Sequence, residues 1–344
     1  MNAGPVNLMS DTQTLPSEAM RATMAAAEVG DEQKLADPTT IELQDRVAAL
    51  LGHEAGLFLP SGTMCNLIGF RLHLRPGGDE AILAANSHPV GFEGGSPAAF
   101  NGAMLRQIDA PTGIFSGEDV VASLREPGNR YAPRSRMISV EQTTNMGGGR
   151  VWSQAAIDEV VGVAREHQMR AHLDGARLMN AAVAAEAEPA LFAAGFDTAW
   201  IDFSKALGAP VGAVLVGSEA LIHEAWRFKQ MIGGAMRQSG ILAAACLFAL
   251  DHHVGRLAAD HDHARRLAEA LADTPGAAVD PATVETNIVI FEVEDPAVFI
   301  AAAEARGVLV GPAGAGRVRA VTHLDVDDVA MQRAIDVLVE LAQG

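Results

Sequence analysis

Short apolar runs of strand length alternate with helix-length segments through most of the chain. The runs predicted to be strands lie at 55–59, 82–85, 137–140, 171–173, 198–201 and 213–216. Between them, segments such as 153–167 carry apolar residues at helical spacing. This alternation is typical of a mainly parallel sheet flanked by helices, so the pattern predicts an α/β fold.

The C-terminal part of the chain follows a different pattern. A long helical region begins near Ile241 and leads into candidate elements at 287–293, 296–305, 318–321 and 326–342. The chain has 344 residues, whereas a single core rarely grows beyond roughly 250–300 residues. We therefore expect a large α/β domain at 1–240 and a small α+β domain at 241–344.

The charge balance bears on the partners of the protein. Acidic residues outnumber basic ones by 43 to 25, which gives a formal net charge of −18. No basic run interrupts this excess, so binding to a nucleic-acid backbone is not expected. No apolar run approaches the roughly 18 residues of a membrane span, and the first residues lack the pattern of a secretion signal. We expect a cytoplasmic protein without membrane partners.

Neither the cysteines nor the histidine-rich stretches predict a metal site. Cys65 and Cys246 are too few for a disulfide framework and wrongly spaced for a metal ribbon. The stretches 251–253 and 260–263 combine Asp with His, but their offset along a helix favours a solvated face. The Gly-rich stretch 311–316 lacks the Lys-Ser/Thr of a P-loop and is interpreted as a loop.

Two predicted strand ends carry residues suited to covalent chemistry. Lys205 follows the apolar run 200–203 and precedes small residues that leave room for an aldehyde ligand. Most lysines are solvated instead. Asp174 ends another run, at the edge where open α/β sheets bind ligands. A pyridoxal ring needs such a carboxylate beside its nitrogen, although Asp174-Gly175 also fits a common turn.

Two further features suit a flat, phosphorylated cofactor. Ser61-Gly62-Thr63 stands at a predicted helix start, where free N–H groups favour an anion such as phosphate. Such residues are more often ordinary helix caps. His88 lies in the loop after the strand at 82–85. It could stack on a ring or act as a base, although a lone loop histidine is more often only exposed.

Taken in this order, 61–63, His88, Asp174 and Lys205 resemble the L-threonine aldolase family of fold-type I pyridoxal 5′-phosphate (PLP) enzymes, relatives of the β-eliminating lyases. The resemblance covers nearly the whole chain, with further stretches at 10–12, 60–66, 92–93, 148–151, 172–180, 204–212, 233–238, 286–289 and 319–323. It implies a PLP-dependent transferase-like fold with a mainly parallel seven-stranded sheet. It also implies a homodimer or homotetramer with active sites at the subunit interface.

The resemblance assigns roles to individual residues. Lys205 is implied as the Schiff-base lysine, Asp174 as the partner of the ring nitrogen, and His88 as the residue that stacks on the ring. Further contacts to the cofactor are implied for Ser61, Gly62, Thr63, Arg177, Ser204 and Arg237, the last at a subunit boundary. Contacts to the substrate are implied for Ser10, Thr144, Arg177 and Arg319.

Three departures from the family pattern affect the expected substrate. Lys34-Leu35-Ala36-Asp37 replaces a usual Tyr-Gly-x-Asp, and Gln230 stands where many members have lysine. Thr144 stands where a second histidine is frequent, near the β-hydroxyl of the substrate. Threonine cannot act as a base, so His88 or a water that it orients is expected to take the hydroxyl proton.

The expected reaction is retro-aldol cleavage of an L-3-hydroxy-α-amino acid to glycine and an aldehyde. Because the second histidine is missing, we expect a larger or aromatic side chain, as in phenylserine, in preference to threonine or allo-threonine. Two alternatives stay open: a β-eliminating lyase or aminotransferase that breaks the Cα–H bond, and a binding protein that keeps the fold without catalysis.

Overall fold

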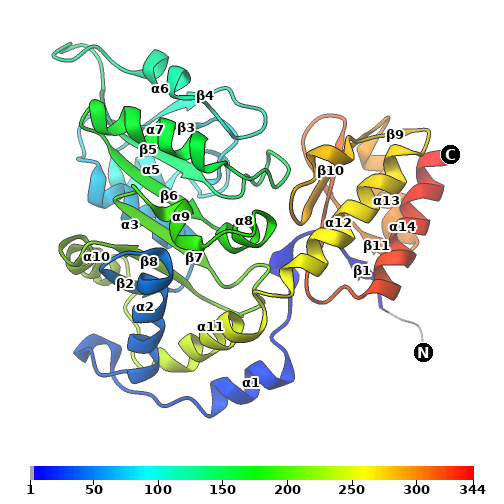
Figure 1. Ribbon diagram of the computed structural model, residues 1–344, viewed down its shortest axis with the longest axis horizontal. Helices are drawn as coiled ribbons and strands as arrows, with labels where there is room; N and C mark the ends of the chain where they lie inside the picture. Colours follow the sequence, from blue (N-terminus) through cyan, green and yellow to red (C-terminus); the bar gives the residue numbers. More distant parts are fainter. Residues whose placement is uncertain (1–3) are drawn as a thin grey trace.

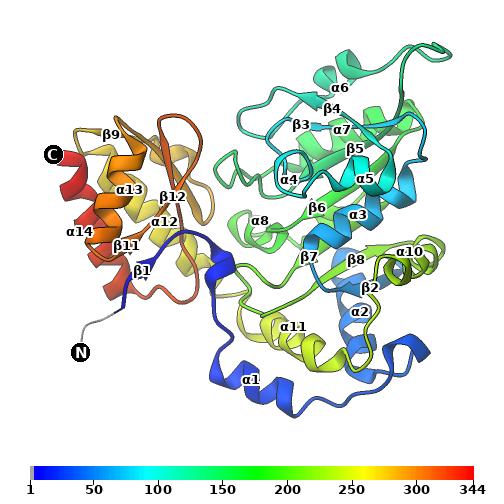
Figure 2. The same ribbon diagram turned by 180° about the vertical axis from the view of Figure 1, so that it is seen from behind.

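The computed structural model describes residues 4–344 as two units (Figure 1 and Figure 2). The larger unit is built on a seven-stranded sheet. Its strands, in spatial order, are β2 (Ala55–Leu59), β8 (Ala213–Gly217), β7 (Thr198–Asp202), β6 (Arg170–Gly175), β5 (Arg134–Glu141), β3 (Asp79–Ala84) and β4 (Met104–Ile108). Only β8 runs antiparallel to its neighbours. The prediction of a mainly parallel seven-stranded α/β sheet is confirmed.

Helices cover both faces of this sheet. They are α1 (Glu18–Ala25), α2 (Pro38–Leu51), α3 (Gly62–His73), α4 (His88–Gly91), α5 (Ser96–Asn101), α6 (Gly117–Ser123), α7 (Gln154–Glu166), α8 (Leu178–Ala184), α9 (Pro189–Ala193), α10 (Glu219–Met231) and α11 (Gly240–His252). Helix α3 packs on β6, β7 and β8 beside α5 and α10, whereas α7 packs on β5 and β6. Short 3-10 turns lie at Asp11–Gln13 (η1) and Glu32–Lys34 (η2).

Local sequence signals set where several of these helices begin. The side chains of Asp37, Ser61 and Ser153 each accept a hydrogen bond from a backbone N–H of the first helical turn. Such a cap satisfies a donor that has no partner within the helix. Helix α2 also has Pro38 in its first turn and ends at Gly52, whose φ is 71°. These boundaries agree with the sequence pattern.

The smaller unit contains a four-stranded sheet and three helices. The strands are β9 (Ala277–Ala278), β10 (Ile288–Val293), β12 (Gly311–Pro312) and β13 (Arg317–Val321), and the helices are α12 (Leu257–Ala272), α13 (Pro296–Ala305) and α14 (Asp328–Gln343). A short 3-10 turn, η3, spans Pro281–Thr283. β1 (Val6–Asn7) and β11 (Val308–Leu309) form a separate parallel pair.

The hydrophobic cores do not divide the chain at residue 240. Ala243 of α11 lies in the core of the large unit, where α11 packs against α1 and α2. Val6 and Leu8, by contrast, lie in the core of the small unit because β1 pairs with β11. Helix α11 is apolar on most sides and is stabilised by burial within the large unit. We propose a small domain formed by α12 onward together with the N-terminal segment.

Among residues 4–344 no single helix is long and apolar enough to cross a membrane. One bent pair, α11 with α12, meets the criterion by length and composition only, and the two helices meet at 69°.

Candidate active site

The predicted site residues gather at one edge of the large sheet. Leu59 of β2 pairs through β8 with Asp202 of β7, and Asp174 of β6 pairs with Glu141 of β5. The carboxyl ends of these strands therefore lead into neighbouring loops. This is the edge at which open parallel sheets bind ligands.

Asp174 is held in a buried, polar environment. The side chain is 1% exposed. Asn66 Nδ2 donates to its Oδ2 at 2.7 Å, and the Ala176 N–H donates to its Oδ1 at 3.1 Å. Burial and the nearby Glu141 carboxylate raise the pKa of Asp174 to about 7, although the charges of Lys205 and His88 act in the opposite direction. A cationic group bound beside Asp174 would favour its ionised form.

His88 begins the short helix α4 and is hydrogen-bonded to the carboxylate of Glu93. Its Nδ1 lies 2.9 Å from Glu93 Oε1, and its backbone N–H donates to Glu141. Burial disfavours the imidazolium, but the hydrogen bond to Glu93 together with the charges of Asp174 and Glu93 outweighs burial and raises the pKa of His88. With Nδ1 bound to Glu93, Nε2 is the ring nitrogen left to accept a proton.

Lys205 lies in the loop after β7, the strand that pairs with the Asp174 strand β6. Its Nζ is 3.4 Å from Asp202 Oδ2 and lies 5.9 Å from the centre of the Trp200 ring. Ser204 donates to the other oxygen of Asp202 through both its N–H, at 2.8 Å, and its hydroxyl, at 2.7 Å. Asp202 thus orders the loop that presents the lysine amine.

The turn 61–63 has the features of an anion site. Ser61 caps the helix α3 through the N–H of Met64, and no hydrogen bond occupies the N–H groups of Gly62 and Thr63 in the described chain. A Cβ at Gly62 would lie 2.4 Å from the Trp200 ring. Glycine is therefore required for the helix start to approach β7 so closely.

The two predicted carboxylate-binding arginines differ in their contacts. Arg177 is 5% exposed and forms a two-pronged pair with Asp11, at 2.8 and 2.7 Å. Despite burial, that guanidinium lowers the pKa of Asp11. Arg319 instead donates one bond to Asn145 at 2.8 Å, and its Nε is buried with no hydrogen-bond partner among residues 4–344. Arg319 is thus the arginine with free donors for a carboxylate.

Three predicted contacts lie in settings that sequence reasoning did not foresee. Thr144 is 2% exposed, and its hydroxyl accepts from the Arg150 N–H within the loop 144–150. Ser10 caps η1. Arg237 is on the surface, where its guanidinium pairs with Asp31 and, within the described chain, makes no hydrogen bond to Lys205, Asp174 or His88. Their roles toward cofactor and substrate remain predictions.

Several residues around the site were given no role from the sequence, although 60–66 and 92–93 belong to the stretches that resemble the family. Asn66 lies within α3, Glu93 follows α4, Asn145 is in a loop, and Glu141 and Asp202 end strands. The strand ends could have been found from their position, since Asp174 was. Asn66, inside a helix, has no position of this kind that would single it out.

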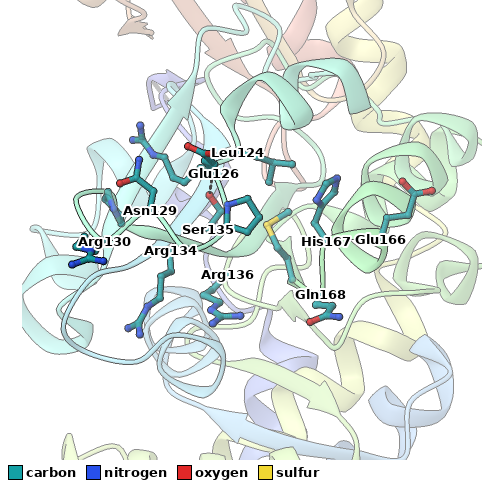
Figure 3. Close-up of a pocket in the computed structure, with 15 residues that line it drawn as sticks. Leu124, Glu126, Asn129, Arg130, Arg134, Ser135, Arg136, Glu166, His167 and Gln168 are labelled. Atoms are coloured by element: carbon teal, nitrogen blue, oxygen red, sulfur yellow. Dashed lines mark hydrogen bonds between the residues drawn. The ribbon is translucent and has the colours of Figure 1, made fainter.

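A cavity of about 900 Å³ lies elsewhere, at the start of β5 and the end of α7 (Figure 3). Arg125 and Arg134 line it, but they pair with the buried carboxylates of Glu80 and Asp79. This is the amino edge of the parallel strands, opposite to Glu141 and Asp174.

Within residues 4–344, no group of three or more His, Cys, Asp or Glu side chains is arranged to hold a metal.

Comparison with known proteins decides the family. The sequence model of the Beta-eliminating lyase family matches residues 7–294. The chain belongs to this family. The low specificity L-threonine aldolase of Escherichia coli K12 is 40% identical over 323 residues, which cover 93% of this chain and 94% of that protein.

Further members agree in sequence and shape. The low-specificity L-threonine aldolase 1 of Arabidopsis thaliana is 38% identical, over 92% of this chain and 91% of that protein. The solved threonine aldolase of Leishmania major superposes with a TM-score of 0.84 at 21% identity, over 98% and 100% of the two chains. These likenesses confirm the family resemblance and the fold expected from the sequence.

The residues of this beta-eliminating lyase family member fit PLP. The free N–H groups at the start of α3 suit a phosphate. In the part of the chain that the structure describes, the buried Asp174 carboxylate accepts only from Asn66 and the Ala176 N–H and has no cationic partner, as expected of a group that meets a protonated ring nitrogen. The orphaned Nε of Arg319 suits a carboxylate. Cofactor and amino-acid substrate can thus be accommodated at one sheet edge.

Proposed function

We propose that this protein is a PLP-dependent aldolase that cleaves L-3-hydroxy-α-amino acids to glycine and an aldehyde. The observation that carries the proposal is the buried Asp174 carboxylate at the end of β6, on the sheet edge where Lys205 follows the neighbouring β7 and His88 follows β3. When bound, PLP supplies an electron sink that stabilises negative charge at the α-carbon. The family and the names of relatives at 38–40% identity support this activity.

The proposal gives each of the site residues a separate role. Lys205 provides the amine that holds the cofactor, and Asp174 meets its ring nitrogen. Arg319, with Asn145 beside it, binds the substrate carboxylate. His88 accepts the β-hydroxyl proton at Nε2, while Glu93 fixes the ring through Nδ1. General base catalysis of this kind is typically worth about 10²–10⁴-fold in rate.

We propose further that a bulky or aromatic side chain is preferred over that of threonine. Thr144 occupies the place of a second histidine, and its hydroxyl is engaged by the Arg150 N–H. The chain thus offers no imidazole there to assist small substrates. A homodimeric or homotetrameric assembly and a location in the cytoplasm are part of the same proposal.

A substrate panel tests the proposal directly. L-threonine, L-allo-threonine and L-phenylserine are compared for aldehyde release, and we expect phenylserine to be cleaved with the highest kcat/KM. A strong preference for threonine would contradict the side-chain proposal. Release of ammonia and a keto acid without aldehyde would instead favour β-elimination or transamination. Lys205→Arg, which keeps the charge near Asp202 but not the reactive amine, should abolish cleavage.

A further inference from the structure

The side chain of Asn66 is hydrogen-bonded to several residues of the proposed site. Its side chain is 1% exposed. Nδ2 donates to Asp174 Oδ2 and to Glu93 Oε1, both at 2.7 Å. Oδ1 lies 2.8 Å from Trp200 Nε1 and 3.1 Å from His172 Nε2. All hydrogen-bonding capacity of the amide is thereby used, by groups from β6, from β7 and from the segment after α4.

The chemistry of these neighbours fixes the orientation of the amide. The Trp200 indole can only donate, so Asn66 Oδ1 must accept and Nδ2 must face the two carboxylates. His172 therefore donates from Nε2 and accepts at Nδ1 from the Thr198 hydroxyl, 2.8 Å away. That hydroxyl in turn accepts from His73 Nε2 at 2.8 Å.

Both histidines of this chain of hydrogen bonds are neutral near pH 7. Burial, followed by the proximity of His73, lowers the pKa of His172 to about 3. Burial also lowers the pKa of His73 to about 4. A neutral imidazole has one donor and one acceptor nitrogen. The hydrogen bonds therefore all point in one direction. They run from His73 through Thr198, His172 and Asn66 and end on the Asp174 carboxylate.

We propose that Asn66 is a positioning residue: one of its amide protons favours the ionised form of Asp174, and the other fixes Asp174 relative to Glu93, which is hydrogen-bonded to His88. The inference rests on the proposed function of this site. Asp174 is buried beside Glu141 and Glu93, a setting that favours its neutral form. The donor from Asn66 opposes that tendency at Oδ2 of Asp174. Glu93 accepts the other amide proton and is hydrogen-bonded to His88 Nδ1, so it sets the position of His88.

The substitution Asn66→Asp tests the N–H donor to Asp174 separately from the rest of the side chain. It keeps oxygen acceptors for Trp200 and His172 but replaces the N–H groups that face Asp174. Apoprotein is titrated by equilibrium dialysis with PLP and with 1-deaza-PLP, which carries carbon in place of the ring nitrogen. We expect PLP affinity to fall about tenfold or more, and 1-deaza-PLP affinity to change by less than about threefold, because that compound has no nitrogen for Asp174 to meet.

In Asn66→Asp the new carboxylate lies beside those of Asp174 and Glu93, which can impair folding. A second variant is designed for that case. Asn66→Asp combined with Glu93→Gln has the same charge as the wild type yet still lacks the donor to Asp174. The ratio of the two dissociation constants should shift toward 1-deaza-PLP in the same sense. Asn101→Asp is the matched control, since Asn101 is a buried asparagine that donates to the Leu67 carbonyl next to Asn66.

The outcomes separate the inference from the proposed function. A selective loss of PLP affinity in both Asn66 variants, with an unchanged ratio in Asn101→Asp, supports the inference. Equal loss for both compounds, or no loss, overturns it, because a purely structural role for Asn66 does not distinguish nitrogen from carbon. If wild-type apoprotein binds neither compound, the proposed function fails as well.

Discussion

His88 and Glu93 make the pH dependence of the proposed base testable. His88 must be neutral to accept a proton, and the hydrogen bond to Glu93 and the nearby carboxylates raise its pKa in spite of burial. The base is therefore available only as the pH rises through that raised value. Glu93→Gln removes a carboxylate, so the pKa should fall and the acid limb of kcat/KM against pH should move to lower pH.

Ser96→Ala is the control for this profile. Ser96 donates to Glu93 Oε2 at 3.3 Å, so its loss removes a hydrogen bond but keeps the carboxylate. The acid limb should stay where it is in the wild type. An acid limb that is unmoved by Glu93→Gln, or that moves to higher pH, would show that His88 is not the base that titrates.

At the scale of single residues, position along a strand decided what the sequence could predict. Lys205, Asp174 and His88 each follow an apolar run, and parallel strands bring their ends together. Asp11 and Arg177 could not be paired in this way, because 166 positions separate them. The resemblance identified Arg177, but only the structure shows that its guanidinium is already bound to a buried carboxylate.

Helix α3 approaches β6 closely at Gly69. A Cβ at this position would lie 2.4 Å from His172 Cε1, inside the chain of hydrogen bonds that ends on Asp174. Gly69→Ala should therefore destabilise the protein by about 1–3 kcal/mol through overpacking, despite the better helix propensity of alanine. Urea unfolding followed by far-UV circular dichroism measures the change in the free energy of unfolding.

The matched control is a glycine with free space around it. A Cβ at Gly162 of α7 meets nothing within 4 Å. Gly162→Ala should leave stability unchanged or raise it by up to about 1 kcal/mol, since alanine favours a helix interior. Equal effects at the two positions would mean that α3 can shift away from His172 at little cost.

At the scale of elements, buried strands were predictable and marginal ones were not. The apolar runs of β2, β7 and β8 are fully or largely buried and were predicted nearly to their ends. β4 was missed because it is an edge strand that carries Arg106 and Gln107. β1 and β11 have two residues each and pair across 302 positions, as Val6 with Val308. Periodicity cannot reveal a pair of that length.

At the scale of the whole molecule, Arg237 lies on the surface and, among residues 4–344, pairs only with Asp31. Its side chain is 61% exposed and pairs with Asp31. The backbone around it is well ordered, since Glu32 donates to the Arg237 carbonyl and Met236 donates to the Glu32 carboxylate. An ordered, exposed arginine suits the predicted position at a subunit boundary, where it would reach the cofactor phosphate of a second copy.

Mixing two inactive variants tests whether the site is shared between copies. Lys205→Ala lacks the amine, and Arg237→Ala lacks the proposed phosphate contact, so each homo-oligomer should have little activity. A mixed dimer has one site with both defects and one site with neither. Unfolding and refolding the two chains together at equal concentration should therefore restore roughly a quarter of the wild-type aldehyde release. Activity no greater than the mean of the two variants would place Arg237 outside the partner's site.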